Sequence, residues 1–369
     1  MAPWFRELAA RPDIELHVVF LRHLTDSAQG MGFGTAFKWD VPLLQGYSSE
    51  SLDVTPSFFQ SLSLFTRLST VFAERDPELV IVTGWNESLL VAAQLFTKLL
   101  GRRLVVRGES NSLRPRRGIV RFLHRTLLRL PKAFLSIGEK NREFYSENGV
   151  ESSRIFPGAY FVETERMLAM ESAHRHERQQ LREARGYSDE DVVLLFCGKH
   201  VPFKRPKLLI EAAAKLRANG ASVKVLYAGS GELTHQLVEA ARELDVPTHF
   251  EGFLNQTELW RAYLSADVFV LPSDNGETWG LVVNEAMLFG LPVLVSNEVG
   301  SRYDLVVDGV TGYGFEPSAD ALAEAAQPLL ADAALRKAMG EQGRERVKSL
   351  YSSHVATEGL LAAVKRLCR

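Results

Sequence analysis

The sequence predicts an α/β protein with two doubly wound, Rossmann-like domains. Short runs rich in Val, Leu and Ile recur along the chain without polar alternation, as in parallel strands buried on both faces. Helical patterns separate these runs, which indicates parallel sheets covered by helices. With 369 residues, the chain is long enough for two such domains.

Nine apolar runs are expected to be strands. They are 14–21, 79–84, 103–108, 133–138, 192–198, 223–229, 248–253, 267–273 and 292–296. Segments such as 87–101 and 206–220 carry helical patterns, and the second begins at Pro206 and ends at Gly220. The highly charged segment 163–191 has no strand pattern, so we interpret it as the connection between the domains.

The N-terminal domain is expected to lack its first strand. Residues 3–20 predict a helix followed by a strand, whereas a doubly wound domain normally begins with a strand and a Gly-rich turn. The missing strand would be central, and its neighbours would lose ladder partners. One explanation is a true start upstream; the other is a rearranged sheet or another segment in the gap.

Composition excludes several protein classes. No stretch approaches the about 20 apolar residues of a membrane span, and the N-terminus lacks the apolar centre of a signal peptide, so we expect a cytoplasmic protein. Two cysteines exclude a disulfide scaffold or a cysteine-based metal cluster. A net charge of −2 argues against a general nucleic-acid binder.

A buried acid is predicted in the helix that starts near 281. This helix is apolar on nearly all sides and ends at Gly290, yet it contains Glu285, and Glu277 lies eight positions earlier. Either protein groups satisfy the Glu285 carboxylate, or a ligand with two hydroxyls, such as a ribose, does. The ligand interpretation requires that neighbouring side chains do not already saturate it. Free N–H groups at the helix start suit a phosphate.

Two lysines follow a predicted strand in the loop 198–206. Lys199 and Lys204 lie at the strand's carboxyl end, where open α/β sheets bind ligands. Two cations there could neutralise a departing diphosphate without a metal ion, although solvated surface lysines are the alternative. A second strand–turn–helix segment, AGSGEL, contains Gly229.

These motifs occur in one order: GKHVPFKR, AGSGEL, FEGFL, ADVFVLPS and two glutamates eight positions apart. In this order the sequence resembles glycosyltransferase family 4 (glycosyl transferases group 1), enzymes of the GT-B fold, which implies two Rossmann-like domains that face each other across a cleft. The resemblance covers about residue 160 to the end well and the N-terminal half loosely. It implies an acceptor-side domain over 1–170, a nucleotide-sugar domain over 171–345, and a C-terminal helix over 346–369 that crosses back.

The resemblance also implies residue roles. Glu285 would hold the ribose, and the catalytic set would be Glu277 against the transferred sugar with Lys204 and Lys199 on the diphosphate. The other donor-binding positions would be Gly198, Gly229, Phe253 near the base, Thr278, Trp279, Gly280, Leu281 and Val282. Family members retain anomeric configuration and use a nucleotide sugar as co-substrate, with no metal and no cofactor. The sequence has no D-x-D motif, and it carries Lys199 where many members have Arg.

Acceptor-side residues are less clearly marked. Glu109 could contact the acceptor and Arg107 could steer an anion, or the two could form a surface pair. Trp85 could stack on a sugar or pack in the core. Residues 30–42 do not fit G-x-G-x-x-G, because position 35 is Thr, and we interpret them as a mobile acceptor-side loop.

The segment 114–132 is strongly basic. Arg121, Arg125 and Arg129 recur every four residues on one helix face, with leucines on another. Such a helix can rest on anionic lipid at the inner face of the plasma membrane, or it is a half-buried helix with a solvated basic face.

The leading hypothesis is therefore a retaining, metal-independent glycosyltransferase (hexosyltransferase-like, EC 2.4) that acts on a glycan or lipid-linked acceptor in polysaccharide biosynthesis. A catalytically weak or inactive nucleotide-sugar-binding GT-B protein is the main alternative. An epimerase or a phosphorylase of the same fold is favoured less. An oxidoreductase is excluded because no G-x-G-x-x-G follows a strand. The sequence does not identify the base, the sugar or the acceptor.

Overall fold

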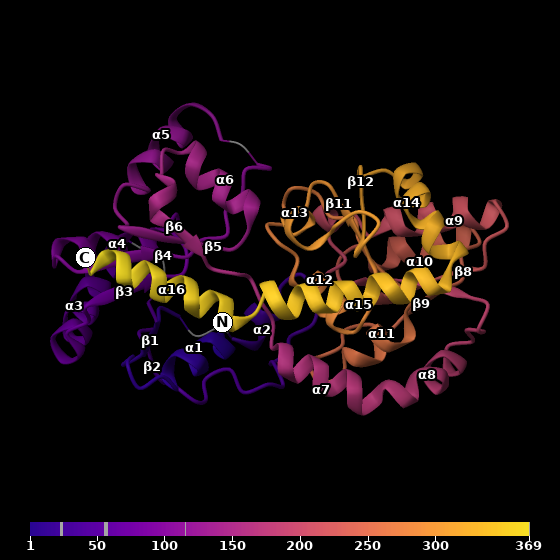
Figure 1. Ribbon diagram of the computed structural model, residues 1–369, viewed down its shortest axis with the longest axis horizontal. Coiled ribbons are helices and arrows are strands. Elements are labelled where there is room, and N and C mark those ends of the chain that lie inside the picture. Colours follow the sequence, from indigo (N-terminus) through magenta and orange to yellow (C-terminus); the bar gives the residue numbers. More distant parts are fainter. Residues whose placement is uncertain (23–24, 55–57, 115, 369) are drawn as a thin grey trace. The chain divides into compact units, whose positions relative to one another are not determined.

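The computed structural model describes residues 1–22, 25–54, 58–114 and 116–368, and these form two compact units (Figure 1). Unit 1 consists of Met1–Leu24, Leu43–Tyr160 and Ser353–Arg369. Unit 2 consists of Thr25–Pro42 and Phe161–Ser352. All strand pairs of the described residues are parallel, which confirms the predicted α/β class.

Unit 2 is built on one six-stranded sheet with the order β12-β11-β10-β7-β8-β9. Its strands are β7 (Val192–Cys197), β8 (Val223–Ala228), β9 (Thr248–Phe250), β10 (Val268–Leu271), β11 (Val293–Ser296) and β12 (Gly312–Phe315). The chain runs outward from β7 to β9 and then returns to place β10 on the other side of β7. The strand order therefore reverses between β7 and β10, and ligands of doubly wound proteins bind at such a switch point.

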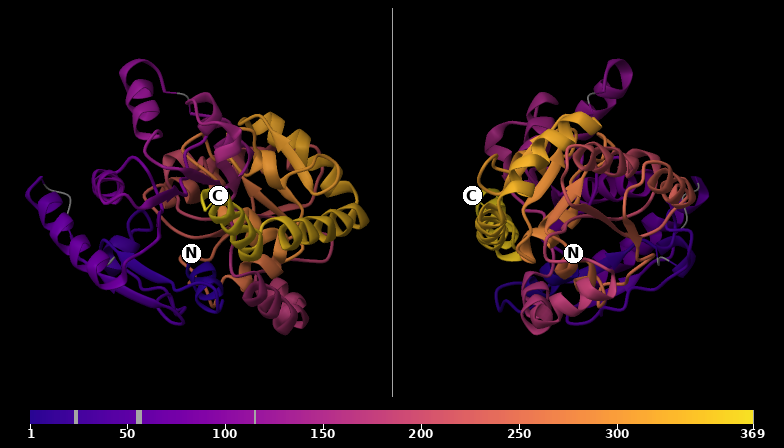
Figure 2. Two further views of the ribbon diagram at one scale, coloured as in Figure 1. Left: turned by 60° about the vertical axis from the view of Figure 1, so that its left-hand side comes forward. Right: turned by 90° about the vertical axis from the view of Figure 1, so that its right-hand side faces the viewer.

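Helices cover both faces of this sheet (Figures 1 and 2). One group packs together and against β8, β11 and β12; it contains α9 (Lys207–Ala218), α10 (Thr234–Glu243) and α14 (Ala319–Ala331). The other group contains α7 (Thr164–His174), α8 (Arg178–Ala184), α11 (Trp260–Ser265), α12 (Leu281–Leu288) and α15 (Ala333–Leu350). The remaining short helices are α2 (Asp26–Gln29) and α13 (Arg302–Leu305).

Side-chain alternation along β7 sorts its residues between these two helix layers. Leu194 and Phe196 belong to the core formed with α9, α10 and α14. Because neighbouring strand residues point to opposite faces, Cys197 points toward the α11 and α12 side. The last residue of β7 thus lies on the face where the predicted buried acid is found.

Helix α12 is short because glycines in left-handed conformations bound it. Gly280 precedes it with φ of 87° and Gly290 follows it with φ of 77°. A Cβ on Gly340 of α15 would lie 1.8 Å from the carbonyl oxygen of Gly290, so α15 approaches the end of α12 closely only with glycine there.

Unit 1 contains two separate parallel sheets. One pairs β1 (His17–Phe20) with β2 (Ser48–Ser51), and the other has the order β3-β4-β5-β6. The strands of the second sheet are β3 (Leu79–Val82), β4 (Arg103–Val106), β5 (Ala133–Ser136) and β6 (Ile155–Pro157). No strand of the described residues joins the two sheets, as expected for a domain without its central strand.

The helices of unit 1 are α1 (Ala2–Ala9), α3 (Phe58–Arg75), α4 (Ser88–Leu99), α5 (Gly118–Leu127), α6 (Glu139–Glu147) and α16 (Ser353–Leu367). The C-terminal α16 packs on α1 and β6. The Trp4 indole N–H donates to Thr357 Oγ1 at 3.1 Å, and a Cβ on Gly359 would lie 1.7 Å from the Pro157 carbonyl oxygen. This glycine lets the last helix lie directly on the backbone of the sheet.

Each of the nine predicted strands contains an observed strand, and three further strands were not predicted. The three are β2, β6 and β12, with the sequences SSES, IFP and GYGF. They are short, polar or glycine-containing, and each lies at the end of its sheet's strand order. The segment 163–191 is free of strand, as predicted, and forms α7 and α8.

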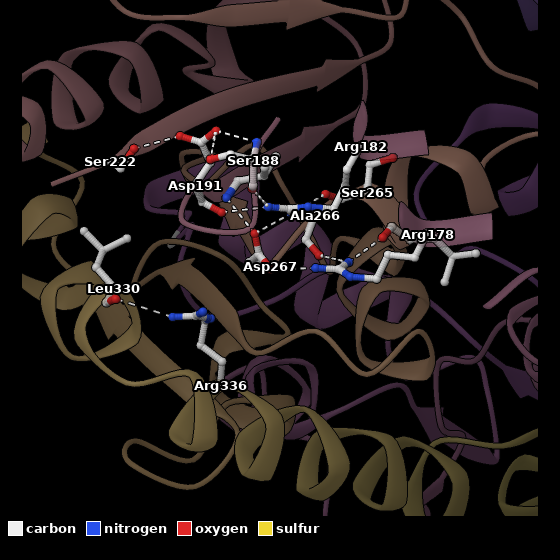
Figure 3. A network of polar contacts seen from close by, with 12 residues as sticks. Arg178, Arg182, Ser188, Asp191, Ser222, Ser265, Ala266, Asp267, Leu330 and Arg336 are labelled. Atoms are coloured by element: carbon white, nitrogen blue, oxygen red, sulfur yellow. Dashed lines mark hydrogen bonds and ion pairs between the residues drawn. The ribbon is translucent and has the colours of Figure 1, made fainter. Parts of the chain in front are cut away.

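A network of buried charges ties α8 to the starts of β7 and β10 (Figure 3). Asp267 accepts from Arg178 at 2.6 Å, from Arg182 at 2.8 Å and from the Val193 N–H at 2.8 Å. Arg182 also donates to the carbonyl oxygens of Ser188, Asp191 and Ser265. Since every group has a partner, the network holds a helix against the sheet without an uncompensated charge.

We predict that Asp267→Ala destabilises the protein by about 3–5 kcal/mol, because it leaves the nearly buried Arg182 guanidinium without its counter-ion. The measurement is urea unfolding followed by circular dichroism.

Glu258→Ala is the matched control, since Glu258 forms an exposed pair with Arg261 at 3.6 Å and is expected to contribute less than about 1 kcal/mol. Equal losses for the two variants would contradict the structural role assigned to Asp267.

Candidate active site

The loops that carry the predicted chemistry all leave one edge of the unit 2 sheet. Residues 198–206 follow β7, 229–233 follow β8, 251–257 follow β9 and 272–280 follow β10. In a parallel sheet, these carboxyl ends meet at the same edge. The loops after β7 and β10 flank the switch point and are joined directly, because the Asp274 N–H donates to the Phe203 carbonyl oxygen at 2.7 Å.

Lys204 and Glu277 form an ion pair across the switch point. Both side chains are only slightly exposed, at 13% and 14%. The structure therefore brings together two of the three residues predicted to be catalytic, one from the loop after β7 and one from the loop after β10. A mostly buried ion pair beside open loops provides a cation and a carboxylate that a ligand can separate.

Glu285 is buried on α12, as predicted, with 7% exposure. Its Oε2 accepts a hydrogen bond from the Tyr263 hydroxyl at 2.7 Å. Burial raises the pKa of Glu285, while hydrogen bonds from Tyr263 and Gln256 and the charge of Arg166 act in the opposite direction. Protein side chains thus supply part of the donors that we had assigned to a ligand, and a ligand can satisfy only the remaining acceptor positions.

Arg166 connects Glu285 to α7. Its guanidinium donates to the Gln256 side-chain oxygen at 2.7 Å and to the Gln256 carbonyl oxygen at 3.1 Å. It also donates to Glu163 at 2.7 Å. With its oxygen held by Arg166, the Gln256 amide group is oriented to donate toward Glu285, so the position of this carboxylate depends on a chain of oriented side chains.

Cys197 lies beside Glu285 and Tyr263 at the end of β7. Burial raises the pKa of its thiol to about 12, and the nearby Glu285 charge adds to the shift. The thiol therefore stays protonated at neutral pH and is unsuited to act as a nucleophile. It is a core residue, as the sequence indicated.

The start of α12 presents backbone rather than side chains. Trp279 is 2% exposed, and its indole N–H donates to Asn284 Oδ1 at 2.9 Å. Gly280 adopts a left-handed conformation, and a Cβ there would lie 2.6 Å from Leu271. Leu281 and Val282 are half-buried and begin the helix, and Thr278 precedes them in the loop. The N–H groups of this first turn are the groups that could hold a phosphate.

Glycines allow close approach between the loops after β7 and β8. Gly229 has φ of 132°, and a Cβ on it would lie 2.0 Å from the Gly198 carbonyl oxygen. The Gly229 N–H donates to the Gly252 carbonyl oxygen at 2.7 Å. Gly198 also adopts positive φ, at 145°. Gly229 requires glycine because backbone meets backbone there, and Gly198 favours glycine because of its positive φ.

Lys199 and Phe253 contact the segment 25–42, part of which we had interpreted as a loop on the acceptor side. Residues 25–42 belong to unit 2, so the interpretation of 30–42 as an acceptor-side loop is wrong. The Phe33 ring lies 5.2 Å from Lys199 Nζ, and the Phe37 ring lies 4.2 Å from that of Phe253. The sequence signal was the aromatic spacing in GFGTAFKW, which alone does not indicate where the rings pack.

The acceptor-side candidates are packed within unit 1. Arg107 is 3% exposed, and it donates to the carbonyl oxygens of Gly158 and Ala159 at 3.3 and 3.1 Å. Glu109 is exposed and accepts from the Tyr160 hydroxyl at 2.6 Å. Trp85 is 2% exposed and donates to Ser110 at 3.1 Å. Of these three side chains, Glu109 is the one that solvent reaches freely.

Sequence reasoning missed Tyr263 and two buried polar atoms at this edge. His200 Nε2 and Ser273 Oγ are buried without a hydrogen-bond partner in the described residues. His200 Nδ1 pairs with Thr234 at 2.9 Å, and burial lowers its pKa to about 4, so the ring is neutral. Tyr263 gave no signal because WRAYLS has the pattern of an ordinary helix, and nothing in it indicates a contact with Glu285, 22 positions later.

Within the described ranges, no group of three His, Cys, Asp or Glu side chains is placed to hold a metal ion. No helix in the same ranges combines the length and the apolar character that crossing a bilayer requires.

Comparison with known proteins identifies a domain. Residues 177–346 match the family model described as glycosyl transferases group 1. The chain is 28% identical over 223 residues to a lipopolysaccharide 1,2-N-acetylglucosaminetransferase of Salmonella typhimurium. The aligned region covers 57% of this chain and 56% of that protein. The chain spans about half the length of the curated relatives it matches.

Solved structures share the whole fold. A glycosyltransferase of Rickettsia africae has a TM-score of 0.74 at 14% identity and covers 96% of this chain and 98% of its own. Anabaena HepE, solved with UDP and glucose, has a TM-score of 0.70 at 15% identity, covering 95% and 99%. Residues 177–346 are therefore similar to the group 1 glycosyl transferases, and the chain has the GT-B fold with two Rossmann-like domains.

Proposed function

We propose that this protein is a retaining, metal-independent glycosyltransferase that takes a sugar from a nucleotide-sugar donor held by unit 2. The observation that carries the proposal is the Lys204–Glu277 pair at the β7–β10 switch point, with the buried Glu285 in the adjacent helix. Unit 1 would contribute the acceptor side. A glycan or a lipid-linked glycan is the proposed acceptor, since a matched relative is named for transfer to lipopolysaccharide.

Glu285 would bind the ribose. A carboxylate offers about four acceptor positions, and Tyr263 and Gln256 use two of them. The remaining positions suffice for a pair of hydroxyls. The Phe253 ring, after β9, would pack against the base, and HepE's complex with UDP shows that this fold accepts a uridine nucleotide in that protein.

Lys199, Lys204 and the first turn of α12 would hold the diphosphate. Phosphate charge favours a helix N-terminus, and the N–H groups of Leu281 and Val282 lie there, after Thr278 and Gly280. Gly198 would let backbone approach the phosphates closely because it has no side chain, and Gly229 would let the loop after β8 pack against Gly198. In this arrangement the cations replace a metal ion.

Catalysis would follow from moving Lys204 between two anions. In the free protein it pairs with Glu277; with donor bound it would stabilise the charge that develops on the departing phosphate. Glu277 would then lie against the sugar as its anomeric carbon becomes positive. The acceptor hydroxyl attacks from the face that the phosphate leaves, its proton passes to the leaving phosphate, and the configuration is retained.

A binding protein without turnover is the second candidate. The observation that favours it is the division of unit 1 into two sheets, which leaves the acceptor side without a continuous strand order. Such a protein would keep the donor site of unit 2 and lack transfer.

We also propose peripheral contact with the cytoplasmic face of an anionic membrane through α5. None of its residues is buried, and Ile119, Phe122 and Leu123 share a helix face with exposures of 76%, 68% and 52%. Arg121 and Arg125 lie on another face of α5, where both donate to the Glu147 carbonyl oxygen at 3.2 Å. A helix with an exposed apolar face and arginines on another face suits a headgroup–acyl boundary.

Of the nucleoside diphosphates UDP, GDP and ADP, at least one should raise the melting temperature of the wild type. At a hundred times its Kd, a ligand stabilises by about 2.7 kcal/mol, which is a shift of a few degrees. Lys204→Ala should lose most of this shift because it removes a phosphate cation. The measurement is a thermal melt with and without each nucleotide.

Lys215→Ala is the matched control, since Lys215 is an exposed lysine of α9 paired with Asp320. It should keep the full shift. A wild type that responds to no nucleotide would refute the donor site. The protein is then incubated with nucleotide sugars that contain the nucleoside diphosphate that raised its melting temperature. Released or transferred sugar identifies an enzyme, whereas binding without turnover identifies the binding protein.

Glu285→Gln should stabilise the free protein more at pH 7.5 than at pH 5 and also abolish the nucleotide shift. The pKa of Glu285 is raised, so the folded state binds this proton more tightly and loses stability as pH rises above the usual carboxyl pKa. The amide removes that loss and also removes the ribose acceptor. Urea unfolding at the two pH values measures the first effect.

Glu324→Gln, on the exposed side of α14, is the control, and its free energy of unfolding should equal that of the wild type at both pH values. A Glu285→Gln variant that is less stable than the wild type at pH 7.5 would contradict a carboxylate retained for binding.

Membrane contact predicts sedimentation of the wild type with vesicles containing anionic phospholipid and little sedimentation with neutral ones. Phe122→Ser should reduce binding severalfold because it removes the most exposed aromatic of α5.

Leu244→Ser, at an exposed apolar position after α10 in unit 2, is the control and should bind as the wild type does. Equal, negligible sedimentation with both kinds of vesicle would end the membrane proposal and leave the donor proposal intact.

A further inference from the structure

The segment Thr25–Pro42 leaves unit 1 after β1 and lies on the candidate donor site of unit 2. Two anchors fix it there. On one side, the Ser230 hydroxyl donates to the Phe33 carbonyl oxygen at 2.6 Å. On the other, the Asn255 amide donates to the Lys38 carbonyl oxygen at 2.7 Å, and the Thr257 N–H donates to Asp40 at 3.2 Å.

Between these anchors, aromatic rings cover Phe253. The Phe37 ring lies on it with centroids 4.2 Å apart and an interplanar angle of 32°, and the Phe33 ring meets its edge at 5.1 Å. A flat base between two rings needs about 3.5 Å on each side, or about 7 Å between the rings. Phe37 and Phe253 are therefore too close to admit a base between them.

The same segment also reaches the phosphate side. Lys199 Nζ lies 5.2 Å from the Phe33 ring centroid, within range of a cation–π interaction. A Cβ on Gly32 would lie 2.9 Å from Lys199 Cδ, and one on Gly231 would lie 2.8 Å from the Gly32 carbonyl oxygen. Backbone of the segment therefore lies against the loops after β7 and β8, in the space assigned above to a diphosphate.

We propose that residues 29–40 form a plug in which Phe37 occupies the nucleobase subsite and Phe33 holds Lys199 away from the diphosphate. This inference rests on the proposed function, because it takes Phe253 as the base platform. The donor then binds by displacing the Phe37 ring, and apparent affinity falls with the fraction of molecules in which the plug is closed.

The plug is built to open. Thr35, Ala36 and Lys38 are exposed, and the rings of Phe33 and Phe37 are only half-buried. A segment with few buried contacts and exposed backbone opens locally at low cost. A diphosphate attracts Lys199 more strongly than a ring does, since it carries full negative charge.

Trp39 reports on this segment without labelling. Its ring packs edge-on against Phe37 at 4.8 Å and is half-buried, whereas Trp4, Trp85, Trp260 and Trp279 are each 7% exposed or less. Acrylamide quenching of intrinsic fluorescence therefore reports chiefly on Trp39. UDP should increase quenching in the wild type, and Trp39→Phe should remove the change.

Phe37→Ala should tighten UDP binding roughly three- to tenfold, because it removes the ring that competes with the base. Isothermal titration calorimetry with UDP, and with GDP and ADP in parallel, gives the affinities. Phe122→Ala on α5 is the matched control and should leave them unchanged.

Asp40→Ala is the second variant, and it loosens the Thr257 anchor without altering either ring. It should also tighten nucleotide binding and raise Trp39 quenching before any nucleotide is added. Asp320→Ala, at an exposed acid of α14, is its control and should match the wild type.

The outcomes separate this inference from the proposed function. Tighter nucleotide binding by Phe37→Ala or Asp40→Ala than by the wild type supports the plug. This holds also if wild-type binding is too weak to measure and a variant binds measurably. Unchanged or weaker binding by both variants overturns the plug, since Phe37 would then be a wall of the base site, and leaves the donor site standing. Absence of binding to the wild type and to both variants overturns both proposals.

Discussion

The arrangement of the candidate site depends on the reversal of strand order between β7 and β10. All strand pairs described in unit 2 are parallel, so every loop that follows a strand emerges at one edge, and the reversal brings the loops after β7 and β10 together at the switch point. Lys204 comes from one loop and Glu277 from the other, and their ion pair joins the two loops. A shift of either strand would separate these charges.

The buried strands and helices of unit 2 could be predicted from the sequence because buried elements consist of apolar residues. VVLLFC is apolar at every position since β7 is covered on both faces, and α12 is likewise apolar around Glu285. β2, with the sequence SSES, shows no such pattern because it is one strand of a two-stranded sheet. Partners distant in sequence were also inaccessible: nothing in WRAYLS indicates that Tyr263 donates to Glu285, and nothing in GFGTAFKW indicates that Phe37 packs on Phe253.

Buried charge has two distinct uses in this chain. Around Asp267, both terminal nitrogens of Arg182 donate to oxygens, and the result is a fixed junction between α8 and the sheet. Glu285 differs because its hydrogen-bond donors, Tyr263 and Gln256, are neutral, and burial raises its pKa although the charge of Arg166 acts to lower it. A carboxylate that costs folding free energy where an apolar residue would pack points to a demand other than stability, and the proposed ribose contact is such a demand.

Three side chains assigned to the donor also have an internal partner in the free protein. Lys204 pairs with Glu277, Lys199 lies on the Phe33 ring, and Phe253 is covered by Phe37. These partners resemble parts of the proposed ligand: the Glu277 carboxylate takes the place of a phosphate, and the Phe37 ring takes the place of a base. A ligand that replaces one of them gains little, because it must break an existing contact. A nucleotide sugar replaces all of them together, so a site of this kind would select the complete donor over free phosphate, free base or free sugar.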